Sequence, residues 1–256
     1  MKHIEMAEIL SNDNLTDDIL SMELLCPEIA KEAVSGQFVE VYTGLSDMIL
    51  PRPISISEID KEKGTITLVY QVVGKGSDYF SQCPVGDTLK VMGPCGNGFE
   101  IRNDFTESIL VGGGIGTAPL VELSKHLKGK ISVFIGSRTE PVLIDKFKNL
   151  GCNVYVSTDD GSAGFKGNVV ELMNSVMPKG DIIYTCGPKI MLKNVAKWGA
   201  EYDLPVQVSM EERMACGIGA CVGCVVKIKK NHGEWENLKV CKDGPVFMGD
   251  EVMWDE

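Results

Sequence analysis

Four cysteines near the end of the chain have the spacing of a metal-binding motif. Cys216, Cys221 and Cys224 lie within "CGIGACVGC", and Cys241 follows after sixteen further residues. A structural zinc site usually pairs two short hooks of cysteine or histidine, whereas this chain offers one C-x2-C pair and a lone distant cysteine. C-x4-C-x2-C with a distant fourth cysteine is the plant-type [2Fe–2S] pattern. We therefore predict that these four cysteines bind a [2Fe–2S] cluster; zinc, or no metal, is the alternative.

The residues between these cysteines suit a loop that wraps around a cluster. Gly217, Gly219, Ala220 and Gly223 are small, and glycine adopts backbone angles that other residues avoid. Backbone amides can then approach the sulfurs, and such hydrogen bonds tune the reduction potential of a cluster. Because a [2Fe–2S] centre moves one electron at a time, the chain requires an electron donor and an electron acceptor.

A glycine-rich turn in "ILVGGGIGTAPL" is a candidate nucleotide site. It follows an apolar, strand-like run and precedes a helical segment, whose free amides favour a phosphate group. The turn departs from G-x-G-x-x-G at its final position, and Ser137 and Arg138 end the next strand where an acidic residue is usual. Taken alone, the turn fits either a dinucleotide site or a structural turn. The candidate residues are Gly113, Gly114, Gly116 and Thr117.

A second turn, in "YTCGPKIM", places Cys186, Gly187 and Pro188 where a strand ends and a helix begins. Ligands bind at the carboxyl ends of the strands in parallel sheets, so this turn is a second candidate for the nucleotide. A plain turn with Pro188 at the first helical position explains the same residues.

Arg52 and Ser55 stand close together in "LPRPISIS". Because Pro53 cannot donate to a central strand ladder, the segment is expected to be an edge strand or to face a site. An arginine and a serine there can hold a phosphate-bearing ligand. A solvated loop is the alternative.

Charge and hydropathy exclude several classes of function. The 256-residue chain has a formal net charge of −11, whereas nucleic-acid binding needs clustered Lys and Arg. No apolar run reaches the roughly 18–20 residues of a membrane span, and "MKHIEMAEIL" has no signal-peptide core. We therefore expect a cytoplasmic protein that binds neither nucleic acid nor membrane, with its other five cysteines buried rather than in disulfides.

Three regions must position these motifs. Residues 1–103 hold short β-branched and aromatic runs at 36–44, 64–74 and 86–94, which predict a small antiparallel β-barrel. In residues 104–208 apolar strands alternate with helical segments, which is typical of a parallel-sheet α/β domain. Residues 209–256 are too few for a good core, so we expect something other than hydrophobic burial to hold them.

Together, these motifs resemble the ferredoxin–NADP reductase superfamily, in which an FAD-binding barrel precedes an NAD(P) domain. The shared marks are R-P-x-S at 52–55, GGGIGTAP at 112–119 and CGP at 186–188. With "GPCGNGF" at 93–99 and the cysteine motif, the chain resembles more narrowly the electron-transfer subunits of class 1B, NAD-linked dihydroorotate dehydrogenases. This resemblance covers essentially the full length in the same domain order. It implies FAD-binding, NAD-binding and [2Fe–2S] domains at the three ranges given above.

The resemblance also implies roles for individual residues. Arg52 would lie near the FAD phosphates, Ser55 near the flavin ring, and Gly76 and Ser77 would offer an amide and a hydroxyl to the pyrophosphate. The residues implied for FAD are Arg52, Pro53, Ile54, Ser55, Val69, Tyr70, Gln71, Gly76 and Ser77. The two turns would form the NAD site, and the four cysteines would ligate the cluster. No catalytic residue is implied, and His3, His126 and His232 are expected to be structural or surface residues.

Two positions depart from the wider superfamily. Many flavin reductases have R-x-Y-[ST], where the tyrosine stacks on the flavin; Ile54 replaces it here and leaves the stacking partner unidentified. Ser77 stands where relatives often have threonine and keeps the hydroxyl. Arg138 can meet the 2′-phosphate of NADP, but the resemblance favours NAD.

The resemblance implies electron transfer in pyrimidine biosynthesis. A separate FMN-bearing catalytic subunit would oxidise dihydroorotate, and electrons would reach NAD⁺ through the [2Fe–2S] cluster and FAD, in a heterotetramer of two of each chain. Related small subunits serve bifurcating ferredoxin reductases and sulfhydrogenases, but a cluster ligand there can be a residue other than cysteine, so four cysteines favour the first alternative. A third possibility is a zinc-stabilised, non-enzymatic ligand-binding regulator.

Overall fold

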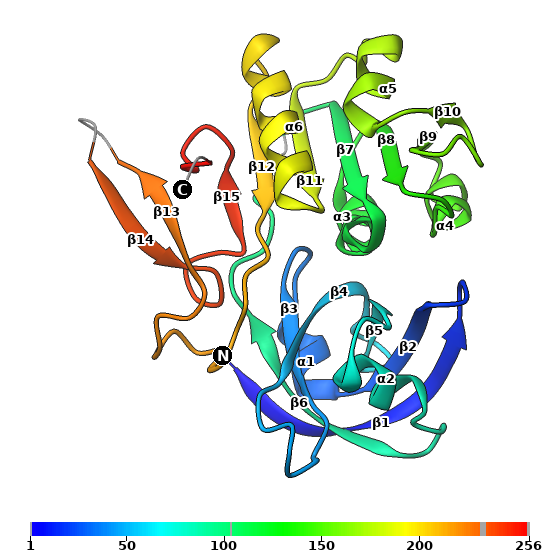
Figure 1. Ribbon diagram of the computed structural model, residues 1–256, viewed down its shortest axis with the longest axis vertical. Coiled ribbons are helices and arrows are strands. Elements are labelled where there is room, and N and C mark those ends of the chain that lie inside the picture. Colours follow the sequence, from blue (N-terminus) through cyan, green and yellow to red (C-terminus); the bar gives the residue numbers. More distant parts are fainter. Residues whose placement is uncertain (1, 103, 231–233, 255–256) are drawn as a thin grey trace.

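The computed structural model describes residues 2–102, 104–230 and 234–254. Figure 1 shows a barrel, an α/β domain stacked on it, and a smaller C-terminal region beside both. This is the predicted order of architectures. The exact domain boundaries, at 103/104 and 208/209, stay predictions. None of the described helices is long and apolar enough to cross a membrane.

The N-terminal region is a closed antiparallel barrel with the strand order β1-β2-β5-β4-β3-β6. Its elements are β1 (His3–Asn14), β2 (Ile19–Leu25), α1 (Pro27–Glu32), β3 (Phe38–Tyr42), β4 (Arg52–Asp60), β5 (Thr65–Gln71), α2 (Lys75–Ser81) and β6 (Thr88–Cys95). Every second side chain of β5 points into the barrel, so Ile66, Leu68 and Tyr70 belong to one buried cluster, as the alternating sequence pattern predicts. The two N-terminal strands complete the barrel beyond the strands expected from sequence.

Strand β4 is not an edge strand, because a closed barrel has none. At its start, residues 52–55 pair only with β3, since pairing with β5 begins at Ile56. Pro53, which cannot donate a backbone hydrogen bond, therefore lies where β4 has a neighbouring strand on one side only. Residues 52–55 thus have one unpaired side although β4 as a whole is not an edge strand, which is compatible with a stretch that faces a site; they form a strand and not a solvated loop.

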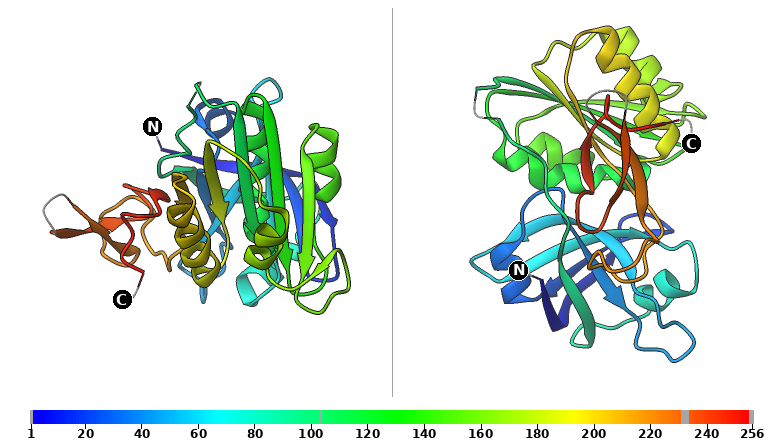
Figure 2. Two further views of the ribbon diagram at one scale, coloured as in Figure 1. Left: turned by 90° about the horizontal axis from the view of Figure 1, so that it is seen from above. Right: turned by 90° about the vertical axis from the view of Figure 1, so that its left-hand side faces the viewer.

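The second region is a sheet with the order β10-β9-β8-β7-β11-β12-β15, parallel except for its last strand. Its elements from this region are β7 (Glu107–Gly113), η1 (Gly114–Thr117), α3 (Pro119–His126), β8 (Lys130–Ser137), α4 (Ile144–Asn149), β9 (Asn153–Thr158), β10 (Phe165–Lys166), α5 (Val169–Val176), β11 (Ile182–Cys186), α6 (Lys189–Glu201) and β12 (Val206–Ser209). Helices cover both faces, with α3 on the side of the barrel and α6 on the side away from it (Figures 1 and 2). This layering buries both faces of the parallel strands.

The C-terminal region shares its core with the α/β domain. Its elements are β13 (Val225–Lys229), β14 (Trp235–Lys239) and β15 (Val246–Met248). The last of these pairs antiparallel with β12, and Val226 and Ile228 belong to the same buried cluster as Val206. Hydrophobic burial against the α/β domain therefore helps to hold this region, beside the further contribution that the sequence predicts.

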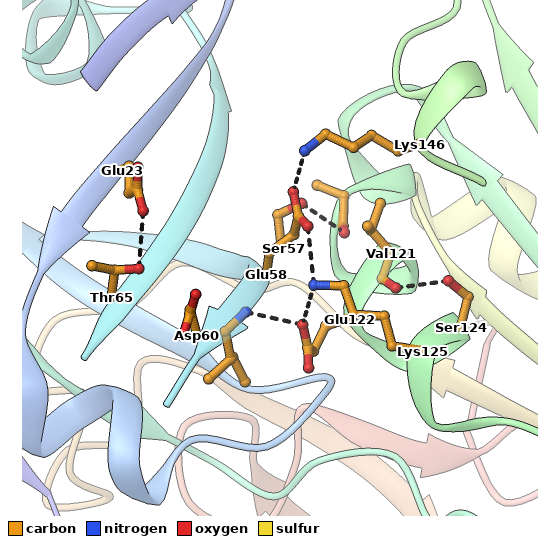
Figure 3. Close-up of polar contacts among 12 residues, drawn as sticks. Glu23, Ser57, Glu58, Asp60, Thr65, Val121, Glu122, Ser124, Lys125 and Lys146 are labelled. Atoms are coloured by element: carbon orange, nitrogen blue, oxygen red, sulfur yellow. Dashed lines mark hydrogen bonds and ion pairs between the residues drawn. The ribbon is translucent and has the colours of Figure 1, made fainter. Parts of the chain in front are cut away.

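A polar network fixes the α/β domain on the barrel (Figure 3). Glu122 of α3 is 3 % exposed and accepts a hydrogen bond from the Ile59 amide of β4 at 2.9 Å. Lys125 bridges Glu122 and Glu58, at 3.0 Å to each, and Lys146 reaches Glu58 at 2.6 Å. Burial opposes ionisation of Glu58, but hydrogen bonds from the two lysines lower the pKa of its carboxyl overall. The network thus fixes the position of the α/β domain, predicted to bind NAD, relative to the barrel, predicted to bind FAD.

Replacing Glu122 with alanine is expected to destabilise the protein by about 2–3 kcal/mol, because the partly buried Ile59 amide and Lys125 would both lose a charged partner. Urea denaturation of the FAD-loaded chain measures the change. Glu140→Ala, at an exposed position between β8 and α4, is the matched control and should leave the free energy of unfolding nearly unchanged. Equal effects of the two substitutions would contradict this role for Glu122.

Candidate cofactor and cluster site

One cavity of about 780 Å³ lies where the three regions meet. It is bounded by residues 47–53 of the barrel, by Gly187, Pro188, Lys189 and Leu192 of the α/β domain, and by residues 210–214. The last of these segments leads into residues 216–224, which carry the first three predicted cluster ligands and are called the cysteine loop below. Arg52 and Pro53 of the R-P-x-S motif and Gly187 and Pro188 of the CGP motif therefore line the same space. Its volume suits a cofactor-sized ligand.

Arg52 lies against the start of helix α2. A Cβ atom built on Gly76 would come within 2.4 Å of the Arg52 Nε atom, so the guanidinium occupies the space that a side chain would take. The same guanidinium donates to the Leu50 carbonyl at 2.5 Å. The structure thus brings together Arg52 and Gly76, which are far apart in sequence and were both assigned to the FAD phosphates. Their contact with FAD stays a prediction.

The Ser77 hydroxyl has partners of its own at the start of α2. It accepts the Val73 and Gly74 amides at 2.9 and 3.2 Å and lies 3.0 Å from the Gly74 carbonyl oxygen, to which it can donate. This arrangement caps the helix. The hydroxyl expected to meet the pyrophosphate therefore shapes the turn, and the backbone amides nearby are the groups that remain for a phosphate.

The three residues predicted on β5 point in different directions. Tyr70 is buried inside the barrel, where its hydroxyl contacts Asn12 Oδ1 at 3.0 Å. Val69 is buried in a cluster with Ala118 of the α/β domain, and Gln71 donates to Asp18 at 2.7 Å. Any contact from Val69 or Tyr70 to FAD must therefore come from the main chain.

The two predicted nucleotide turns touch each other. Strands β7 and β11 are neighbours, with Gly112 opposite Cys186. A Cβ atom built on Gly116 would lie 2.5 Å from the Cys186 carbonyl oxygen, and one built on Gly113 would lie 2.8 Å from Pro188 Cδ. Both turns stand at the carboxyl edge of the parallel sheet, where nucleotides bind in such folds.

Thr117 and Cys186 are the two residues of these turns whose side chains carry a polar atom or a thiol; Thr117 is buried, whereas Cys186 is partly exposed. Thr117 is fully buried, and its Oγ1 has no hydrogen-bond partner among the described residues. Burial raises the pKa of the Cys186 thiol to about 12, so this thiol stays neutral at physiological pH. These two side chains thus shape the nucleotide turns and carry no charge.

Gly116→Ala is expected to raise the KM for NADH about tenfold, because the new methyl group meets a backbone carbonyl that two paired strands hold in place. Steady-state reduction of an artificial dye by NADH measures the effect. FAD content, read from the visible spectrum, should stay at the wild-type level, since Gly116 lies outside the barrel. A normal KM would show that the nucleotide binds elsewhere.

The cysteine loop has features of a cluster-binding loop. The Cys221 amide donates to Cys216 Sγ at 3.4 Å. Burial alone would raise the pKa of Cys216, but hydrogen bonds from the Cys221, Ile218 and Ala220 amides lower it to about 6. The loop therefore presents amide donors to an anionic sulfur, which is the environment that an iron-bound thiolate needs.

The other two cysteines, Cys224 and Cys241, form a second pair. Burial, together with a hydrogen bond to Cys224, raises the pKa of Cys241 to about 12. No set of three or more His, Cys, Asp or Glu side chains in the described ranges is gathered as for a metal ion. Two pairs of thiols are compatible with two irons that each take two thiolates, so the donor set fits a [2Fe–2S] cluster.

The structure also settles the surroundings of two histidines. His3 lies 3.4 Å from Glu32, and His126 lies 2.7 Å from Glu122 of the interdomain network. Both belong to structural contacts, as expected, whereas His232 lies outside the described residues. Sequence reasoning missed Lys2 and Glu40, which lie next to the cysteine loop and have no motif around them.

Comparison with known proteins decides the family. A model of the iron–sulfur cluster binding domain of dihydroorotate dehydrogenase B matches residues 211–253, and a model of the oxidoreductase FAD-binding domain matches residues 6–99. The electron transfer subunit of dihydroorotate dehydrogenase B (NAD(+)) from Desulforamulus reducens is 42 % identical over 100 % of both chains. The chain belongs to this family. The same subunit from Enterococcus faecalis is 39 % identical over 97 % of this chain and 98 % of its own length.

Family membership agrees with the predicted cofactors and with an oxidoreductase subunit. The two matched models place an FAD-binding domain on the barrel and an iron–sulfur domain over all four cysteines, so the zinc alternative is not supported. Among solved structures, an NADH-dependent reduced ferredoxin–NADP oxidoreductase, studied for flavin-based electron bifurcation, superposes with a TM-score of 0.88. It shares 34 % identity, over 98 % of this chain and 91 % of that one.

Proposed function

We propose that this chain passes electrons from the FMN of a dihydroorotate dehydrogenase catalytic subunit to NAD⁺, with a [2Fe–2S] cluster and FAD as its own cofactors, in pyrimidine biosynthesis. The observation that carries the proposal is the single cavity bounded by the R-P-x-S strand, the CGP turn and the residues that lead into the cysteine loop. The first two segments are the ones assigned to FAD and to the nucleotide, and the third leads directly to Cys216, the first predicted cluster ligand.

The residues of this chain bind and position, and the cofactors supply the redox chemistry. FAD exchanges a hydride with NAD and single electrons with an iron–sulfur centre. Arg52, held against Gly76, would neutralise the FAD pyrophosphate at the start of α2. The turns at Gly113–Thr117 and Cys186–Pro188 would place the nicotinamide nucleotide at the sheet edge beside the cavity. The four cysteines would hold the cluster.

The catalytic partner would dock over the cysteine loop. Ile218 and Val222 stand between the proposed ligands and are 53 % and 73 % exposed, although both are apolar. Apolar side chains this exposed favour a protein interface, and the ligands behind them need a partner within electron-transfer distance. The proposal therefore includes an FMN-bearing catalytic subunit at this loop, in a heterotetramer of two of each chain.

A cytoplasmic location completes the proposal. All nine cysteines are free, which agrees with a reducing compartment. NAD is preferred over NADP because the relatives carry that nucleotide in their names. Arg138, after the end of β8, is the residue to replace if NADP proves to be the substrate.

Co-expression with the catalytic subunit of the same organism tests the function. The purified complex should contain both chains in equal numbers, FMN, FAD and two irons per cluster, and it should reduce NAD⁺ when dihydroorotate is added. This chain alone should oxidise NADH with a dye but should not oxidise dihydroorotate. A complex that reduces NAD⁺ only with another donor would overturn the dihydroorotate assignment.

The structural similarity to the bifurcating oxidoreductase supports a second candidate, the small subunit of an NADH-linked ferredoxin–NADP reductase. The four cysteines favour the first candidate, because that second group can use a ligand other than cysteine. Co-purification separates the two candidates: the second predicts a complex with NADH-linked ferredoxin reduction and no response to dihydroorotate.

A further inference from the structure

Glu40 is a buried carboxylate without a partner. It lies in the middle of β3, is 0 % exposed, and neither Oε1 nor Oε2 has a hydrogen-bond partner within the described part of the chain. Its strand neighbours are Pro53 and Met92, which offer no side-chain donor. Burying an unpaired carboxylate costs several kcal/mol by general estimates. Packing of the barrel therefore does not explain this residue.

The cysteine loop covers Glu40 directly. A Cβ atom built on Gly217, the residue after Cys216, would lie 2.8 Å from Glu40 Cγ and 3.0 Å from Oε1. The loop backbone thus rests on the carboxylate with no side chain between them. Any group bound by Cys216 experiences the charge of Glu40 through protein rather than through water.

Lys2 contacts the same site with the opposite charge. Its Nζ atom donates to the Gly217 carbonyl and, at 3.1 Å, to the Cys241 carbonyl. One ammonium group thus joins the short cysteine loop to the distant fourth cysteine. Because Lys2 precedes β1 and Glu40 lies in β3, both charges come from the barrel, whereas all four thiols come from the C-terminal region.

These two charges must act on a cluster held by the loop. Reduction adds one negative charge, which a nearby cation stabilises and a nearby anion destabilises. At distances of several ångströms and at the effective dielectric constant of a protein, one unit charge is enough to change the equilibrium between oxidised and reduced cluster about tenfold. Net charge and hydrogen bonds around the sulfurs are among the factors that set cluster potentials.

We propose that the barrel sets the reduction potential of the [2Fe–2S] cluster through these two side chains, with Glu40 lowering the potential and Lys2 raising it. This inference rests on the proposed function, since it takes the four cysteines to bind the cluster. It assigns a role to two residues outside every sequence motif. It also makes the barrel, which carries the FAD-binding domain, a determinant of the electron affinity of the neighbouring centre.

A third charged side chain also contacts the cysteine loop: the cationic Lys239 donates to the Gly219 carbonyl at 2.6 Å, and it is the same in the wild type and in both variants compared below. Two other ionisable groups at this junction, Cys95 and Tyr42, are neutral at the pH of the measurement. Burial raises the pKa of Cys95 to about 12 and also raises the pKa of Tyr42, so both are uncharged at pH 8.5. Burial, with the neighbouring Cys216 charge, raises the pKa of Glu40 to about 7, and Lys2 opposes that shift. Measurements are therefore made at pH 8.5, which favours the ionised form of Glu40 over its neutral form.

A potentiometric titration of the complete chain, followed by the electron paramagnetic resonance signal of the reduced cluster, tests the proposal. Glu40→Gln keeps the shape of the side chain and should raise the midpoint potential. Lys2→Met keeps the aliphatic stem and should lower it. For each variant we expect the ratio of reduced to oxidised cluster at a fixed potential to change by about tenfold, which is ~59 mV for a one-electron couple. Glu62→Gln, on the exposed turn after β4, is the control and should leave the midpoint unchanged.

Shifts of opposite sign in the two variants support the proposal, whereas unchanged midpoints or shifts of the same sign overturn it. If Glu40→Gln fails to assemble the cluster, the sign of the Lys2→Met shift decides. A wild-type chain that binds zinc and gives no signal overturns both this inference and the proposed function. A wild-type signal with unresponsive midpoints overturns the inference alone.

Discussion

Cys221→Ser is expected to abolish the visible and paramagnetic signature of the [2Fe–2S] cluster and to reduce dihydroorotate-dependent NAD⁺ reduction by about a hundredfold or more. Changes that only reorient a metal ligand already cost about 10–100-fold, and this substitution removes a ligand outright. Serine keeps the backbone amide that Cys221 donates to Cys216 Sγ, so the loop retains that contact. The loss can therefore be assigned to the sulfur atom.

The same variant should still reduce artificial dyes with NADH, because the predicted FAD and nucleotide residues lie in the other two regions. Cys83→Ser is the matched control: Cys83 is a buried cysteine of the barrel, and its replacement should leave iron content and both activities near wild type. Loss of dye reduction together with the cluster would show that the cluster mainly stabilises the fold, which contradicts a role confined to electron transfer.

The cluster motif and the two turns could be predicted from sequence because their chemistry is local. The spacing of Cys216, Cys221 and Cys224 is set by one loop, and a glycine turn between a strand and a helix has few alternatives. The barrel and the parallel sheet were likewise predictable from the periodicity of short segments. Each of these features depends on residues that are close in the chain.

Glu40 could not be predicted because its burial depends on a distant segment. In "FVEVY" a lone glutamate among apolar residues is typical of a strand position that faces solvent. The cysteine loop covers it only after the chain has passed through the whole α/β domain. The same holds for β15, a three-residue strand that acquires meaning only by pairing with β12. Contacts between segments that are distant in the sequence cannot be predicted from the residue pattern of either segment alone.

The contact between Arg52 and Gly76 could be predicted only in part from the sequence. Both residues were assigned to FAD separately, from a resemblance, but nothing in the sequence indicated that one fills the space above the other. The structure supplies a steric reason for glycine at position 76: the guanidinium occupies the place of its missing side chain. The glycine at position 76 is thus explained by its contact with Arg52, which is distant in the sequence.

Gly76→Ala is therefore expected to weaken FAD binding about 10–100-fold, which corresponds to the loss of a charge-assisted hydrogen bond worth about 1.5–3 kcal/mol. The new Cβ would lie 2.4 Å from Arg52 Nε, closer than atoms can approach, so the guanidinium must leave the start of α2. A flexible side chain can move at little cost to the fold, and alanine suits a helix better than glycine. The substitution should thus separate FAD affinity from stability.

Gly74→Ala is the matched control for this substitution, two residues earlier in the same turn. Its φ of −175° is extended backbone that alanine adopts, and no atom lies within 4 Å of a Cβ built there. Fluorescence titration of the apoprotein with FAD should show wild-type affinity for Gly74→Ala and the predicted weakening for Gly76→Ala. Arg52→Met should match the Gly76→Ala defect, and combining the two substitutions should add little, because both remove the same guanidinium from the same place. Additive defects would mean that Gly76 contributes to FAD binding through its own backbone, independently of Arg52.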